Sequence, residues 1–143
     1  MECLVFSSVQ RVEFSRKKIE HVVLFVLKQV KINGSVSVHL IGDKKMRSLN
    51  ATYRGKDSTT DVLSFAMGDN KERIYGGEDE LGDIFISIPQ IRRQASTYRV
   101  PYAQEFTRML VHGVLHIVGF DHIHETDAQK MFSLQEHLIT ECI

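Results

Sequence analysis

Three histidines near the C-terminal end of the chain have the spacing of a metal site. His112 and His116 are four residues apart, so on a helix their rings project from one face and can reach one ion. Gly119 allows the chain to turn back, and His122 can then complete a tripod that leaves a fourth position for water. Because three imidazoles are borderline-soft ligands, the spacing predicts one Zn2+ ion bound by His112, His116 and His122.

The residue after the first histidine bears on the kind of hydrolysis. The HxxxHxxGxxH string matches the pattern of metzincin peptidases, which carry a general-base glutamate directly after the first histidine. This chain has Gly113 there, which disfavours a zincin-type peptidase. Zinc can still lower the pKa of a bound water to roughly 7 and polarise a phosphoryl oxygen. Hydrolysis of a phosphodiester therefore remains available without that glutamate.

Two other residues invite a metal role that their positions do not favour. His124 as a fourth imidazole would close the site to water, so we interpret it as a surface histidine. Met131 could be compared with the methionine beneath metzincin zinc sites, but its helical spacing with Leu134 and Leu138 indicates core packing.

Hydrophobic periodicity predicts the elements that must position the histidines. We expect strands at residues 3–12, 35–41, 61–66 and 81–88. We expect five helices, marked by Ser15 as an N-cap, Asp43 as an N-cap, Pro89 in a first turn, Pro101 at a start, and Thr126 near the last start. This order predicts an α+β fold with a mixed sheet of about four strands layered with about five helices, one of them a zincin-like metal helix.

Length and composition indicate one metal-dependent hydrolase domain over residues 1–143. The chain is 43% hydrophobic and 25% charged, as in an ordinary globular domain. Residues 3–6 lack the basic flank of a secretory signal, and the longest apolar run, residues 22–27, is too short to span a bilayer. Cys3 and Cys142 do not form a disulfide framework, so we expect a reducing, cytoplasmic location without membrane contact.

Charge does not by itself indicate a nucleic-acid partner. Lys plus Arg and Asp plus Glu are 18 each, so attraction to phosphate must come from local clusters. Two such clusters occur, and each alone is better explained as a solvated face: Lys44, Lys45, Arg47, Arg54 and Lys56, and then Arg92, Arg93 and Arg99.

Several blocks of the chain resemble one known family. Residues 112–122, HGVLHIVGFDH, resemble the HGxLHxxGYDH signature of the YbeY-type endoribonucleases. Upstream, Asn50 with Tyr53 and Arg54, the TDVLSF run at 60–65 and the GDI run at 82–84 resemble further blocks of that family. The similarity extends in consistent order from about residue 36 to 138. The chain departs from the family pattern at Phe120 for tyrosine, Ala66 for proline and His124 for an acidic residue.

The resemblance implies a single-strand-specific, zinc-dependent endoribonuclease that matures the 16S rRNA 3′ end and takes part in ribosome quality control. Its partners would be single-stranded ribosomal RNA and the small ribosomal subunit, and nothing in the sequence indicates an oligomeric state. The alternatives are a zincin-type metallopeptidase and a noncatalytic ribosome-assembly factor with a structural metal. The nucleophile would be either a zinc-activated water, which we favour, or the RNA 2′-hydroxyl.

Two residues are candidate catalytic groups. Arg54 can hold a phosphate through its planar guanidinium, or it can form a structural ion pair with Asp57 or Asp61. Asp121, beside His122, can accept a proton or orient a ligand histidine, or it can only fasten the turn after Gly119.

Overall fold

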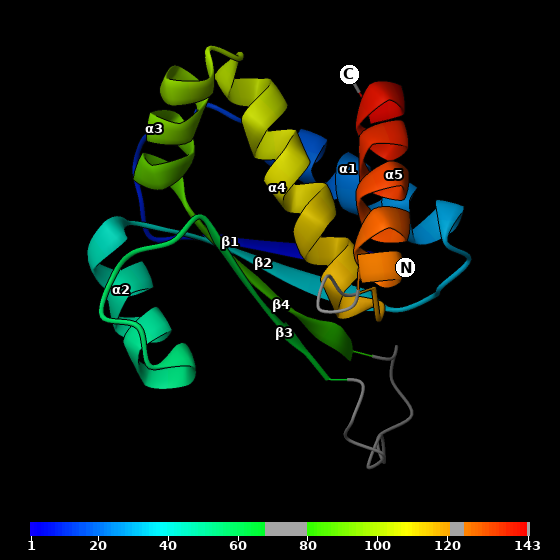
Figure 1. Cartoon of the computed structure of the whole chain (residues 1–143), viewed down its shortest axis with the longest axis horizontal. Helices are drawn as coiled ribbons and strands as arrows, with labels where there is room; N and C mark the ends of the chain where they lie inside the picture. The colour runs from blue at the N-terminus through cyan, green and yellow to red at the C-terminus, as the bar shows by residue number, and fades with distance from the viewer. Residues whose placement is uncertain (68–79, 121–124, 143) are drawn as a thin grey trace.

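The computed structural model describes residues 1–67, 80–120 and 125–142. The described elements, in chain order, confirm the predicted β-α-β-α-β-β-α-α-α pattern and the α+β fold class (Figure 1). They are β1 (Glu2–Ser7), α1 (Arg16–Gln29), β2 (Ser35–Ile41), α2 (Asp43–Arg54), β3 (Val62–Ala66), β4 (Glu80–Ser87), α3 (Ile88–Tyr98), α4 (Tyr102–Ile117) and α5 (Glu125–Cys142).

The four strands form one mixed sheet in the order β1-β2-β4-β3. β1, β2 and β4 are parallel, and β3 runs antiparallel to β4 at one edge. Helix α4 packs against β3 and β4 and also contacts α1, α3 and α5, so it is the central helix of the layer (Figure 1). Helix α2 packs on the other face of the sheet, where Met46 joins Ile41 and Leu63 in a second small core.

The helix that carries the two histidines is held by its apolar face. Phe106, Leu110, Val114 and Ile117 are all buried in the main core, as their helical spacing predicts. Met131 and Leu138 of α5 are buried in the same core, which confirms the core-packing interpretation of Met131. His112 and His116 lie on the opposite side of α4, away from this core, and both are half-buried.

The helix boundaries follow local signals at most ends. The Ser15 side chain accepts a hydrogen bond from the Lys18 amide, 3.1 Å away, and so caps α1 as predicted. After α4, Gly119 has φ of 108°, a backbone conformation that a residue with a side chain rarely adopts. The chain leaves α4 at the predicted glycine. None of the described helices has the length and hydrophobicity needed to cross a bilayer.

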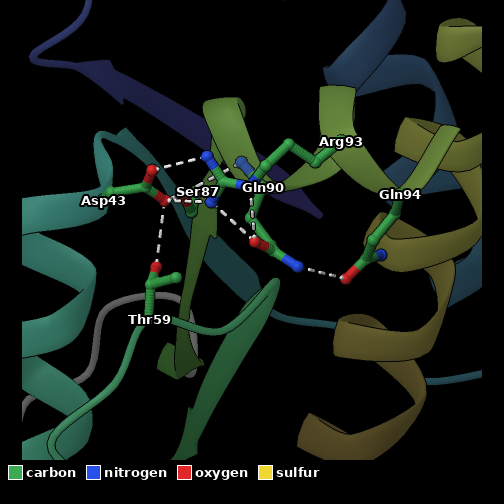
Figure 2. Close-up of polar contacts among 6 residues, drawn as sticks. All are labelled: Asp43, Thr59, Ser87, Gln90, Arg93 and Gln94. Carbon is green, nitrogen blue, oxygen red and sulfur yellow. Dashed lines mark hydrogen bonds and ion pairs between the residues drawn. The ribbon is translucent and has the colours of Figure 1, made fainter. Parts of the chain in front are cut away.

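The predicted N-cap role of Asp43 is wrong. Gly42 is the N-cap of α2 and makes no side-chain cap bond, whereas Asp43 is the first helical residue. The Asp43 carboxylate instead accepts hydrogen bonds from Thr59, Ser87 and Arg93 at 2.8–3.1 Å (Figure 2). The Arg93 hydrogen bond, above all, lowers the pKa of Asp43. The Asp43 carboxylate thus lies in the first turn of α2 and binds tertiary partners instead of capping the helix.

The first strand is shorter than the predicted range of 3–12. It ends at Ser7, which pairs with Leu40 of β2. One residue further along, β2 itself ends at Ile41 and the chain enters α2. β1 is an edge strand and β2 is its neighbour in the sheet. Because β2 ends at this point, the residues after β1 have no strand with which to continue the hydrogen-bonded pairing.

Candidate functional site

His112 and His116 lie side by side at a cavity of about 530 Å³. Their ring centroids are 4.6 Å apart and the ring planes are inclined by 67°. The two rings therefore project from one face of α4, as predicted, and both line the same cavity. The cavity is enclosed by the end of α2, the start of β3, α4 and α5, and its other lining residues are Arg54, Thr60, Asp61, Val62, Leu63, Ser64, Arg108, Met109, Phe132 and Gln135.

Close packing explains why a glycine follows His112. A Cβ atom at position 113 would lie 3.0 Å from Cγ2 of Ile84 and 3.2 Å from the Ser64 hydroxyl oxygen. The Ser64 hydroxyl also donates a hydrogen bond to the Gly113 carbonyl oxygen, at 3.3 Å. A longer side chain at 113 would press against Ser64 of β3 and Ile84 of β4. Close packing therefore favours a glycine at the position where zincins carry the general base.

His112 has a buried polar partner on α5. Its Nδ1 atom lies 2.8 Å from the side-chain oxygen Oε1 of Gln135. The Gln135 side chain is only 3% exposed, although it also borders the cavity. With the amide oxygen as acceptor, Nδ1 carries the ring proton and Nε2 keeps the lone pair that metal ligation requires. The donor chemistry at His112 therefore fits a zinc ligand.

Arg54 reaches the cavity from the last turn of α2. One predicted alternative was an ion pair with Asp57, but Asp57 pairs with Arg47, at 2.7 Å between Oδ1 and Nε. The other was Asp61, whose carboxylate accepts bonds from Thr60 and from the Val62 amide. Arg54 is exposed and lies in the same hollow as the two histidines. This position is available for contact with a bound anion.

Part of the predicted site lies outside the described residues. Asp121, His122 and His124 belong to the segment 121–124, so their placement is not described. Two of the three predicted zinc ligands are thus described. Within residues 1–67, 80–120 and 125–142, no group of three or more His, Cys, Asp or Glu side chains is placed to hold a metal ion.

Several cavity residues were not predicted from the sequence, among them Arg108, Phe132 and Gln135. Arg108 lies one turn before His112 on α4 and pairs with Glu136 of α5, at 3.2 Å, and with the buried Glu105. Phe132, 48% exposed, has its ring 6.5 Å from that of His112. The four-residue spacing from His112 could have indicated Arg108. Phe132 and Gln135 carry no such signal, because only the packing of α5 on α4 brings them to the site.

Known proteins resemble this chain over most of its length. The family model described as Endoribonuclease YbeY matches residues 6–142. Proteins named Endoribonuclease YbeY are 40% identical in Alkaliphilus metalliredigens, over 74% of this chain and 69% of that relative, and in Persephonella marina, over 87% and 81%. The solution structure of TM1509 from Thermotoga maritima shares the fold, with a TM-score of 0.67 at 23% identity, covering 98% of this chain and 88% of that one.

Proposed function

The chain belongs to the YbeY endoribonuclease family, and we propose that it is a zinc-dependent endoribonuclease that cleaves single-stranded RNA. The observation that carries the proposal is the presence of His112, His116 and Arg54 around one cavity. Two imidazoles on one helix face supply a metal-binding pair, and His122 is the proposed third ligand. The guanidinium at the same cavity supplies a phosphate-binding group.

The residues divide the work of phosphodiester cleavage. When bound, zinc supplies Lewis acidity and makes a water molecule a better nucleophile near neutral pH. Arg54 binds the scissile phosphate and stabilises the negative charge that develops on its oxygens. Its exposed position at the end of α2 allows a substrate to reach it without rearrangement of the core. Asp121 is proposed as a proton acceptor or as a residue that orients a ligand histidine.

The cavity also supports an unpaired strand as substrate. Phe132 offers a half-exposed aromatic ring beside His112, on which a splayed nucleobase can stack. A base within a duplex is already stacked and paired, so it cannot use such a ring. Family membership favours ribosomal RNA, with the 16S 3′ end as the processed site, the small subunit as partner and the cytoplasm as the compartment.

Metal removal and substrate choice together test the proposal. We expect chelator-treated protein to lose cleavage of a single-stranded RNA and to regain it on addition of one equivalent of zinc, because zinc would supply the Lewis acidity for the reaction and Gly113 offers no general base in its place. An unfolded polypeptide serves as the second substrate and is expected to remain intact. Full RNA cleavage by metal-free protein would refute the zinc dependence. Cleavage of the polypeptide but not of the RNA would instead support a peptidase.

The identity of the nucleophile can be read from the product ends. We expect water to attack the phosphorus atom, since a zinc site with three neutral imidazoles favours its ionisation near neutral pH. A single 2′-deoxy substitution at the scissile nucleotide should then be tolerated, and no cyclic phosphate should form. Mass spectrometry of the products checks this. Complete resistance of the deoxy substrate, with a 2′,3′-cyclic phosphate on the normal product, would show that the RNA 2′-hydroxyl attacks.

A further inference from the structure

We infer that Gln135 is a positioning residue: its side-chain carbonyl holds the proton of His112 on Nδ1 and so reserves Nε2 for the metal. The inference rests on the proposed zinc site. It starts from the 2.8 Å contact between Nδ1 of His112 and Oε1 of Gln135. A neutral imidazole has one N–H group, and the nitrogen that carries it cannot ligate a metal. An acceptor at Nδ1 therefore selects the tautomer that can bind zinc through Nε2.

The surroundings of Gln135 make this contact selective. The side chain is 3% exposed, so little water competes for the Nδ1–H group, and a hydrogen bond at such a site is stronger than in water. Met131 and Leu138, one turn to either side on α5, are buried in the core and fix the helix against α4. The amide is thereby held beside Nδ1 of the His112 ring. The ring cannot rotate freely about χ2 without losing this bond.

The opposite orientation of the amide makes the inference testable. If the Gln135 amide nitrogen donated to Nδ1, the ring proton would be on Nε2 and metal binding would first require its transfer. A carboxylate at position 135 can only accept from the ring, as in the carboxylate-histidine-zinc arrangement. Gln135→Glu should therefore preserve the function of Gln135 under our assignment, and Gln135→Leu should abolish it while keeping similar volume.

Zinc affinity and the histidine tautomer are the two measurements. We expect competition with a chromophoric chelator to give a zinc affinity for Gln135→Leu about 10–100-fold below wild type, as for other partners of ligand histidines, and close to wild type for Gln135→Glu. The matched control is Glu136→Gln on the same helix, because Glu136 pairs with Arg108 rather than with His112. Its zinc affinity should be unchanged.

Nitrogen-15 NMR of the zinc-free protein reads the tautomer without any dependence on activity. We expect the proton of His112 on Nδ1 in wild type and a mixture of tautomers in Gln135→Leu. A proton on Nε2 in wild type, or equal zinc affinity of wild type and Gln135→Leu, would overturn the inference. If wild type itself bound no zinc, the proposed function would fail and the inference with it. Unchanged affinity in a zinc-binding protein refutes the inference alone.

Discussion

Replacing His116 with alanine is expected to lower zinc affinity by more than about 100-fold, which exceeds the usual effect of losing an outer partner of a ligand. A site that loses one of its three histidine ligands binds the zinc ion poorly, because the two remaining imidazoles cannot restore the coordination number. RNA cleavage should fall by at least about 10³-fold, since the metal contributes several kcal/mol of charge stabilisation in the transition state. Zinc content after gel filtration and cleavage of a labelled single-stranded RNA measure the two effects.

The same loss is expected for His112→Ala and His122→Ala. His137→Ala is the matched control, because His137 is largely exposed on α5 and pairs with Glu141. His124→Ala should also leave zinc occupancy nearly unchanged, since a fourth imidazole is not needed for the open site. Stoichiometric zinc in His122→Ala would contradict the ligand assignment. Equal loss in the His137 control would indicate a general effect on folding.

Replacing Arg54 with alanine is expected to separate metal binding from catalysis. Zinc content and thermal stability should stay close to wild type, because Arg54 is exposed and its removal leaves the core intact. Cleavage of RNA should fall by about 10²–10³-fold, the usual effect of removing one group that stabilises transition-state charge. Single-turnover cleavage at saturating RNA distinguishes this loss from weaker binding.

Two further variants test whether the loss is specific to the Arg54 guanidinium. Arg54→Lys should restore activity only in part, because a point charge cannot reproduce the bidentate contact of a guanidinium with phosphate. Arg47→Ala is the control: Arg47 lies on the same helix but pairs with Asp57 and borders a separate hollow. Removing it should leave cleavage nearly unchanged. Normal activity in both Arg54 variants would mean that this side chain only faces solvent.

Local patterns in the sequence determined the elements and the face of α4 that carries His112 and His116. The alternation in residues 35–41 predicted β2 with its observed bounds, because side chains in a strand point alternately to two faces. The four-residue spacing of His112 and His116 was sufficient to bring their rings together, since helix geometry fixes which residues share a face. Gly119 likewise predicted where the chain leaves α4, because a glycine readily adopts the positive φ found there.

Contacts between distant segments were decided only by the tertiary structure. Asp43 looked like a helix cap, yet its carboxylate accepts hydrogen bonds from Ser87, at the end of β4, and from Arg93 of α3 (Figure 2). Arg54 had two acidic candidates nearby in sequence, but Arg47 occupies Asp57 and leaves Arg54 at the cavity. Gln135 meets His112 across 23 residues because α5 packs on α4. Periodicity records which face of an element is buried, whereas the partner across that face depends on how whole elements pack.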